Sequence, residues 1–413
     1  MGRRGQHDET PEAMADFLVR LGASLLKYGS STHRIEELIT VTAQLRGFSA
    51  RAFAVPTGLW LGVSRPERGD EIVRLIRVHD WAVDLGKLTD LDVLFNQVAD
   101  GSLPLDEASR DLDRIDGRPS RYGAPILVVA GSLASGSAAL FFGGGLREVL
   151  VGVVLGLCVT TMQTVLGRFS RTRLLLDFIA GVVAGLTSWG ATSIFPDLLR
   201  KPLILATVII VVPGMTLTAG IGELAHRNLV SGAARMFQAM MVLLSLVFGL
   251  GLAFALETAA SGGFKPLIAG QSAPFWQLLV GTAVAGAAFV ALLDVPLRYA
   301  LPTIGSGVLA WIATVGAERL LGHGAESALL GALALGLYSN VLARVTERPK
   351  QLFLTPGIIM LVPGAFGFLS FGELLAGDVA SGTAHVFQTL VIGTSLIIGL
   401  LLADAVLPPK KVL

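Results

Sequence analysis

Hydrophobic and polar positions follow two different patterns before and after residue 121. In the first part, apolar residues recur at helical spacing in short segments, as at Phe17, Leu21 and Leu25, and they alternate with polar ones in "ARAFAVPTGLWLGVS" and "DEIVRLIRV". The second part consists of apolar runs of roughly 20 residues, the length that crosses about 30 Å of hydrocarbon. We therefore expect a small α+β domain over residues 1–121, with the element order αα-βββ-αα, followed by a membrane α-helical domain.

The apolar runs predict ten transmembrane helices. We place them at 124–142, 149–167, 174–195, 202–222, 233–256, 275–293, 297–317, 326–343, 352–372 and 385–407. Five spans fall in residues 122–257 and five in residues 272–407.

Composition agrees with this division. Of the 413 residues 53% are hydrophobic and only 15% are charged, and sixteen of the 32 Lys and Arg and nineteen of the 31 Asp and Glu precede residue 122. The net charge is +1 and there is no long basic run, so we expect no nucleic-acid partner. The single cysteine, Cys158, lies in an apolar run and allows no intrachain disulfide. The first residues lack the apolar core of a signal peptide.

Basic residues in the connecting segments predict the orientation. If the N-terminal domain is cytosolic, thirteen Lys and Arg residues lie in or beside the inner segments and five in the outer ones. This asymmetry follows the positive-inside rule. We therefore expect the N-terminal domain and both termini in the cytosol.

The two membrane halves share a repeated segment. Residues 212–238 and 362–388 are identical at eleven of twenty-seven positions without a gap, and both contain Pro-Gly, Gly-Glu-Leu, Ser-Gly and Phe-Gln in the same register. An odd number of spans per unit makes the second unit enter the membrane from the opposite side. The sequence thus predicts two inverted five-helix repeats, as in many secondary transporters.

Each repeat carries a Pro-Gly pair near the middle of a span, at Pro213-Gly214 and Pro363-Gly364. Proline removes a backbone donor, so the carbonyls of Ile209 and Ile359 lose their helical partners. The half-helices that follow present free N–H groups and positive dipole ends. We expect a substrate site at this pair of broken helices, with Thr216 as an additional hydrogen-bonding group. The alternative is that each Pro-Gly is only a packing kink.

Charged residues near the helix ends are candidates for gating or proton coupling. Glu223 and Glu373 follow the two Pro-Gly pairs by ten residues, and Arg235 and His385 follow the glutamates by twelve. We expect each pair to form part of a gate on its own side of the membrane, and His385 to add sensitivity to pH near neutrality. Alternatively, each glutamate bonds loop amides while Ser231 and Ser381 cap the next helix. Asp177 is either a proton site or the partner of Arg173.

The N-terminal segments "LVRLGASLLKYGSSTHRIEELITVTAQLRGFSARAFAVPTGLWLGV" and "VRLIRVHDWAVDLGKLTDLDVLFNQVADGSLPLDEASRDLDRI", with the repeated PG…GEL…SG signature, resemble the threonine/serine exporter family. The order of domains resembles its fused form. Within the N-terminal domain, the family pattern falls on Gly22, Gly29, Arg34, Glu37, Gly47 and Thr57.

This resemblance implies a bacterial inner-membrane exporter of small hydroxy amino acids, driven by the proton gradient. Split relatives are linked to dicarboxylate export, so small dicarboxylates such as succinate are the alternative substrates.

Other function classes have less support. Ser30 and Ser31 lack a nucleophile-elbow setting and His33 and His79 are isolated, so we expect a transporter and not a membrane-anchored hydrolase. No metal-ligand cluster appears, and we expect neither a metal nor a cofactor. The expected partners are the amino-acid substrate, protons and the lipid bilayer, with a homo-oligomer as a further option. A channel would move substrate without coupling to pH.

Overall fold

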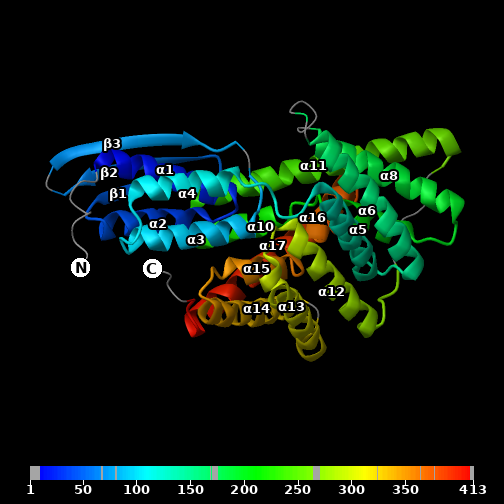
Figure 1. Ribbon diagram of the computed structural model, residues 1–413. Helices are drawn as coiled ribbons and strands as arrows, with labels where there is room; N and C mark the ends of the chain where they lie inside the picture. Colours follow the sequence, from blue (N-terminus) through cyan, green and yellow to red (C-terminus); the bar gives the residue numbers. More distant parts are fainter. Residues whose placement is uncertain are drawn as a thin grey trace.

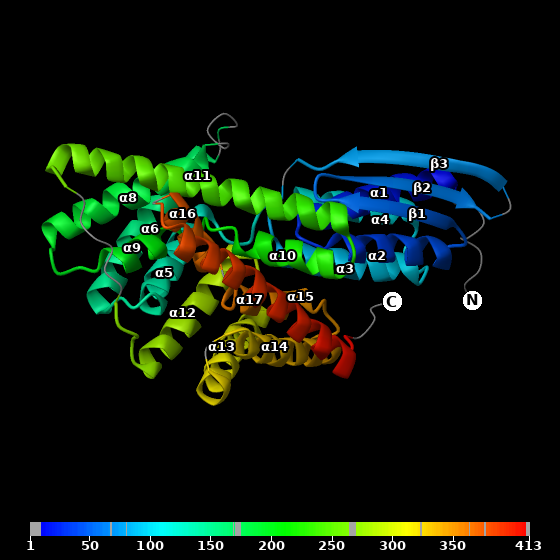
Figure 2. The same cartoon turned by 180° about the vertical axis from the view of Figure 1, so that it is seen from behind.

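The computed structural model describes residues 10–409, apart from 67, 80, 168, 170–174, 264–269, 323, 363 and 376. It has an α/β part at the N-terminus and a helical part that extends from it (Figures 1 and 2). We call residues 10–117 the N-terminal unit and residues 124–406 the membrane part.

The N-terminal unit has the element order expected from the sequence. Its elements are α1 (Pro11–Lys27), α2 (Thr32–Leu45), β1 (Ser49–Val55), β2 (Gly58–Arg65), β3 (Arg68–Arg77), α3 (Leu85–Ala99) and α4 (Leu105–Gly117). The strands form one antiparallel sheet in the order β1-β2-β3, with Phe53 opposite Trp60 and Trp60 opposite Leu75.

The helices of this unit bury the apolar stripes seen in the sequence. Phe17 and Leu21 of α1 are fully buried with Ile35 of α2, Leu59 of β2 and Phe95 of α3. The side chain of Thr10 accepts a hydrogen bond from the backbone N–H of Ala13 and so caps α1. One face of the sheet lies on α1 and α2.

The membrane part consists of two series of helices in the same order. The first is α5 (Ala124–Phe141), α6 (Leu146–Leu166), α8 (Leu176–Ile194), α9 (Arg200–Val208), α10 (Gly214–Ala225) and α11 (Leu229–Ser261). The second is α12 (Phe275–Leu292), α13 (Ala300–Leu321), α14 (Ala325–Thr346), α15 (Gln351–Ile359), α16 (Gly364–Leu375) and α17 (Val379–Val406), with the 3-10 turn η1 (Leu297–Tyr299) before α13.

Eight segments of the described chain are long and apolar enough to cross a membrane, against the ten expected. The expected span 202–222 is instead two short helices, α9 and α10, because Pro213 interrupts it. The expected span 174–195 corresponds to α8, whose sequence "LDFIAGVVAGLTSWGATSI" is diluted by small and polar residues.

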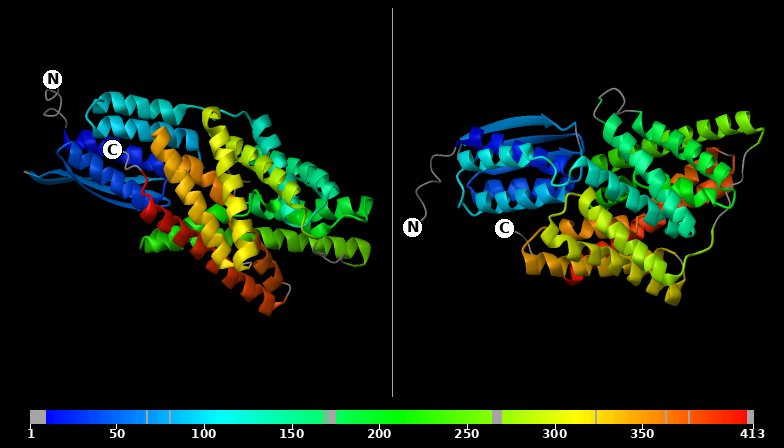
Figure 3. Two further views of the ribbon diagram at one scale, coloured as in Figure 1. Left: turned by 90° about the horizontal axis from the view of Figure 1, so that it is seen from below. Right: turned by 45° about the vertical axis from the view of Figure 1, so that its right-hand side comes forward.

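The two ends of the membrane part differ in what covers them. We call the end that contacts the N-terminal unit the proximal end. There the carbonyl of Leu293 accepts a hydrogen bond from the backbone N–H of Leu85 at 2.9 Å. The helix α11 begins at this end, where Ser231 contacts Ala54 of β1. The helix α17 runs the other way and ends there (Figures 2 and 3). We call the opposite end the distal end.

The long helix of each series crosses its neighbour at a glycine. A Cβ at Gly249 of α11 would lie 2.0 Å from the carbonyl oxygen of Phe178 in α8. A Cβ at Gly399 of α17, 150 positions later, would lie 2.4 Å from the carbonyl oxygen of Leu329 in α14. These backbone contacts leave no room for a side chain at either position.

Gly249→Ala should therefore destabilise the protein by about 1–3 kcal/mol through overpacking. Gly251→Ala is the matched control, since a Cβ there meets nothing within 4 Å. Thermal unfolding of the detergent-solubilised full chain measures both. An apparent melting temperature that falls equally in both variants, or in neither, would contradict the close crossing.

Candidate functional site

The two interrupted helices meet at their breaks. A Cβ built on Gly214 would lie 2.5 Å from Cγ1 of Val362, and one built on Gly364 would lie 2.8 Å from Cγ1 of Val212 and 3.1 Å from Cα of Gly214. The sequence placed both breaks at similar depth, and the structure puts their backbones in contact. Pro363 lies outside the described residues.

The helical hydrogen bonding of both chains is interrupted at this crossing. Between α9 and α10 the chain leaves the helix at Ile209, and Pro213 has φ −80° and ψ 45°. Since Pro213 has no N–H, it cannot bond the carbonyl of Ile209 as an interior helical residue would. In the second series α15 ends at Ile359 and α16 begins at Gly364. The first turns of α10 and α16 thus offer helix N-termini at the contact between the two series.

Two threonine hydroxyls lie on the helix that starts at the first break. Thr216 and Thr218 of α10 are both buried. The Oγ1 atom of Thr218 has no hydrogen-bond partner within the described part of the chain. An unpaired buried hydroxyl is costly, so it is a candidate for bonding a bound molecule.

Glu223 and Arg235 form an ion pair at the proximal end. Glu223 Oε1 lies 3.2 Å from Arg235 Nε, and the two side chains are 2% and 5% exposed. The same carboxylate oxygen accepts from the backbone N–H of Thr32 at 3.4 Å, at the first turn of α2. The Arg235 guanidinium lies 5.7 Å from the ring centre of Trp81. The N-terminal unit therefore supplies part of the surroundings of this pair.

Further contacts join the N-terminal unit to the turn between α10 and α11, beside this ion pair. The Ser231 hydroxyl donates to the Ala54 carbonyl at 3.1 Å, and the Asn228 side-chain amide donates to Thr32 Oγ1 at 3.1 Å. The rings of His33 and His226 stack with their centres 4.1 Å apart. Together these contacts cover the turn between α10 and α11.

Glu373 and His385 occupy the corresponding positions at the distal end. His385 Nδ1 lies 2.5 Å from Glu373 Oε2, and the two side chains are 30% and 27% exposed. The ring of Phe366 lies 6.2 Å from the imidazole. The pair is thus far more open to solvent than Glu223 with Arg235.

The two serines of the repeated segment do not cap helices, contrary to the alternative reading. The Ser231 hydroxyl instead donates to the Ala54 carbonyl of the N-terminal unit. At the start of α17 the capping group is Asp378, whose carboxylate accepts from Ser381 N–H at 3.1 Å. Asp177 lies half-buried in the first turn of α8, and its expected partner Arg173 lies outside the described residues.

Two further ion pairs were not predicted from the sequence. Arg200 donates through Nη1 to Glu257 Oε1 at 2.9 Å, with a second contact from Nη2 to Oε2, and both residues are buried. Lys350 Nζ lies 2.5 Å from Asp404 Oδ2. Arg200 and Lys350 stand 150 positions apart. Arg200 joins the start of α9 to the end of α11, and Lys350 joins the start of α15 to the end of α17. That spacing was the signal that could have revealed them.

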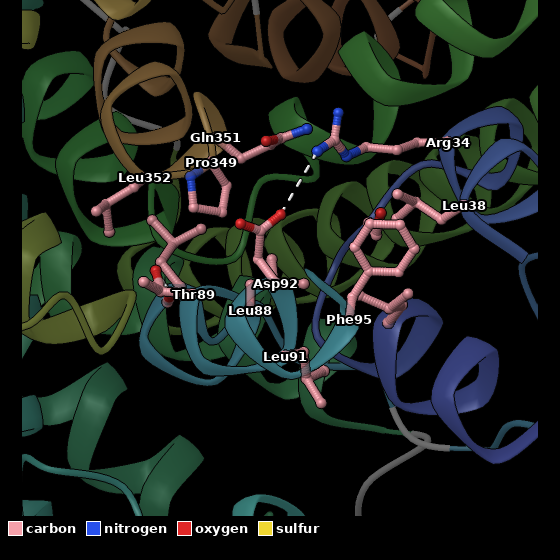
Figure 4. Close-up of a pocket in the computed structure, with 13 residues that line it drawn as sticks. Arg34, Leu38, Leu88, Thr89, Leu91, Asp92, Phe95, Pro349, Gln351 and Leu352 are labelled. Carbon is pink, nitrogen blue, oxygen red and sulfur yellow. Dashed lines mark hydrogen bonds and ion pairs between the residues drawn. The ribbon is translucent and has the colours of Figure 1, made fainter. Parts of the chain in front are cut away.

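A small cavity separates the N-terminal unit from the start of α15 (Figure 4). Its volume of about 20 Å³ is enough for roughly one water molecule. Arg34 of α2 faces Asp92 of α3 across it, with 3.7 Å between the charged groups, and Gln351 lies beside them. Burial raises the pKa of Asp92 to about 6, and the nearby Arg34 and Arg348 only partly offset it.

Two family models match the chain. One, described as "Putative threonine/serine exporter", matches residues 16–257, and a second, described as "Threonine/Serine exporter, ThrE", matches residues 278–406. The chain belongs to the threonine/serine exporter family. The family is one of membrane transporters, and this exporter-family chain is a membrane protein with multiple apolar helices.

Relatives of this exporter-family chain among curated proteins are longer. "Pheromone-regulated membrane protein 10" of Kluyveromyces lactis is 25% identical over 384 residues, which cover 90% of the chain and 39% of that protein. The protein of the same name from Eremothecium gossypii is 24% identical over 405 residues, covering 93% and 53%. An "Uncharacterized protein" of Schizosaccharomyces pombe is 22% identical over 386 residues, covering 91% and 46%.

The chain thus spans about two fifths to one half of the length of these relatives. No solved structure matches it.

The buried Asp92 predicts a pH-dependent stability. Its pKa rises from 3.8 to about 6 in the folded chain, so the folded state binds this proton more tightly than the unfolded state. The resulting stabilisation is complete below pH 4 and is lost as the pH rises through 6. Asp92→Asn should therefore raise stability at pH 8, by up to about 3 kcal/mol, and have little effect at pH 4.

The apparent melting temperature of the full chain, measured from pH 4 to pH 8, checks this expectation. Asp90→Asn on the same helix, at a half-buried carboxylate paired with Arg118, is the comparison variant. A lower melting temperature of Asp92→Asn at pH 8 would show that the ion pair with Arg34 outweighs the cost of burial.

Proposed function

We propose that this chain is a proton-coupled secondary transporter that exports threonine and serine across the inner membrane of a bacterium. The observation that carries the proposal is the contact between Gly214 and Gly364, which joins two interrupted helices of one duplicated sequence. In secondary transporters, substrates bind where such broken helices face each other near the bilayer midplane.

The membrane part, in this proposal, is an inverted repeat of residues 122–257 and 272–407, following a cytosolic domain of residues 1–121. The matching order of helices, the opposite courses of α11 and α17, and the equivalent crossings at Gly249 and Gly399 support the inversion. The fourth span of each repeat is then a broken one, α9–α10 and α15–α16. Counting α8 and α9–α10 beside the eight long apolar segments brings the number of spans to ten. Both termini then lie in the cytosol.

An amino acid presents a carboxylate, an ammonium group and, in threonine and serine, a hydroxyl. The N-terminal turns of α10 and α16, with Pro213-Gly214 and Pro363-Gly364, suit the carboxylate because helix N-termini bind anions. The ammonium group can donate to the carbonyls of Ile209 and Ile359. The hydroxyl of Thr216 or Thr218 is suited to the substrate hydroxyl, which gives hydroxy amino acids an advantage over alanine.

Two gates of different chemistry then control access. Glu223 with Arg235 closes the proximal, cytosolic end, and Glu373 with His385 closes the distal end. Because histidine changes its charge near neutral pH, the distal pair is suited to respond to protons on its side. Asp177 at the start of α8 is a further candidate for the proton route.

The side chains of the N-terminal unit give little support to the alternative function of a hydrolase. Ser31 Oγ lies 3.5 Å from His33 Nε2, but the Nδ1 atom of His33 has no partner among the described residues. Burial, together with His226, lowers the pKa of His33 to about 4, which makes it a weak general base. No described carboxylate takes the place of the acid that orients the histidine of a triad.

Efflux from proteoliposomes tests the proposal. Vesicles containing the full chain are loaded with labelled threonine, serine or succinate, and efflux is compared with and without an imposed pH gradient. We expect gradient-dependent efflux of threonine and serine, and a loss of about tenfold or more in Glu373→Gln and Glu223→Gln, since each removes the carboxylate of a gate pair. Glu107→Gln, on the exposed face of α4, is the control.

Efflux of succinate alone would favour the dicarboxylate alternative. Threonine efflux that ignores the pH gradient and both substitutions would contradict proton coupling and leave the glutamates with a structural role.

The N-terminal unit, in the same proposal, holds the cytosolic gate closed. Its Thr32 N–H bonds Glu223 and its Trp81 ring lies against Arg235, so both members of the gate are held by it. Trp81→Ala removes an interaction of about 1 kcal/mol, which corresponds to roughly a fivefold shift toward the open gate.

This shift predicts faster threonine efflux by Trp81→Ala at low substrate concentration, where gate opening limits the rate. The control is Leu45→Ala, an exposed residue of α2. Efflux that is unchanged or slower in Trp81→Ala, with normal folding, would argue against a closing role.

A further inference from the structure

The N-terminal unit exposes an apolar face of its sheet that the proposed transport cycle does not use. Phe53, Trp60, Val73 and Leu75 are 51%, 44%, 63% and 64% exposed. Phe53, Trp60 and Leu75 lie side by side on the three strands, with the first two rings 5.8 Å apart. We call this surface the outer sheet face. Contiguous exposed apolar surface of this kind marks an interaction site.

Charges of both signs border the apolar row. Arg51 of β1, Gly62 of β2 and Val73 of β3 form the neighbouring row, and Arg51 is exposed. The carboxylate of Glu71 reaches over Gly62, since a Cβ there would lie 2.3 Å from Glu71 Oε1. The outer sheet face thus carries an anion near its centre and cations on its two outer strands, Arg51 of β1 and Arg77 of β3.

The outer sheet face points across the long axis of the molecule and not along it. The strands run in the same general direction as α11, and the sheet and α11 lie along the same edge of the molecule (Figures 1 and 2). The outer sheet face therefore does not point toward the bilayer that surrounds its own helices. It points to where a second molecule in the same membrane would stand.

We propose that the outer sheet face is the contact between two copies of this chain inserted in the same orientation. Two such copies are related by a two-fold axis along the membrane normal, which here runs along the strands. This axis places β2 against its own counterpart and β1 against β3 of the other copy. Trp60 then meets the partner's Trp60, and Phe53 meets the partner's Leu75.

The same axis pairs the charges. Arg51 comes opposite the partner's Val73 and within reach of the partner's Glu71, whose carboxylate extends toward that row. Sheets packed face to face lie about 10 Å apart, a gap that these side chains fill. The face thus brings apolar side chains against apolar ones and opposite charges within reach of each other.

The sheet contact alone is small. Three strands about 4.8 Å apart and roughly 20 Å long cover about 300 Å² per copy, against about 800 Å² in a typical stable interface. The membrane helices on the same edge of the molecule must add to it. The dimer is therefore a property of the full chain in a membrane.

Exchanging the charges of Arg51 and Glu71 tests the interface. The full chain is labelled with one fluorophore per copy, reconstituted in lipid vesicles at a series of densities, and counted by single-molecule photobleaching. We expect dimers of the native chain, and at least a fivefold weaker association for Arg51→Glu, for Glu71→Arg and for Trp60→Ala. The double variant R51E/E71R should regain association, because it restores the pair with the signs exchanged. Glu107→Arg is the control for a change of surface charge.

Three outcomes would overturn the proposal. The first is a native chain that remains monomeric at every density. The second is dimers that none of the single variants weakens. The third is a double variant that fails to recover while its melting temperature equals that of the native chain. Because the readout is stoichiometry and not efflux, its failure is independent of the transport proposal.

Discussion

The rest of the architecture depends on the contact between the backbones at Gly214 and Gly364. Two interrupted helices can approach so closely only because neither carries a side chain at the crossing. Each interruption leaves polar backbone groups in an apolar setting, a cost that is tolerated where those groups face protein or a watery cavity. The contact therefore explains why both breaks occur together and why they lie between the two series of helices.

The two ends of the membrane part show how one duplicated motif can acquire two roles. Both copies keep a glutamate and place a partner twelve residues later, but one partner is arginine and the other is histidine. Arginine keeps its charge at every physiological pH, and its pair is buried beneath the N-terminal unit. Histidine can lose its charge, and its pair is half-exposed. In our account the first pair is controlled by a covering unit and the second by protons.

The sequence was informative where local pattern decides structure. The element order of the N-terminal unit follows from apolar periodicity, and the pairing of Glu223 with Arg235 and of Glu373 with His385 follows from the repeat. Contacts between distant segments could not be read in the same way. Nothing local links Thr32 or Trp81 to the turn at Glu223. The break at Pro213 was predicted from the sequence, but the contact of that break with Gly364 was not.

In the proposed transport cycle the two repeats rock about the contact of Gly214 with Gly364, so that one end opens as the other closes. Distances between spin labels test it most directly, measured by pulsed electron resonance in a Cys158→Ser background. One pair, Arg227→Cys with Val345→Cys, reports the proximal end, and the other, Ile194→Cys with Val379→Cys, reports the distal end. We predict that threonine, or a change of pH, lengthens one distance while it shortens the other. Distances that stay fixed, or that lengthen together, would contradict the account.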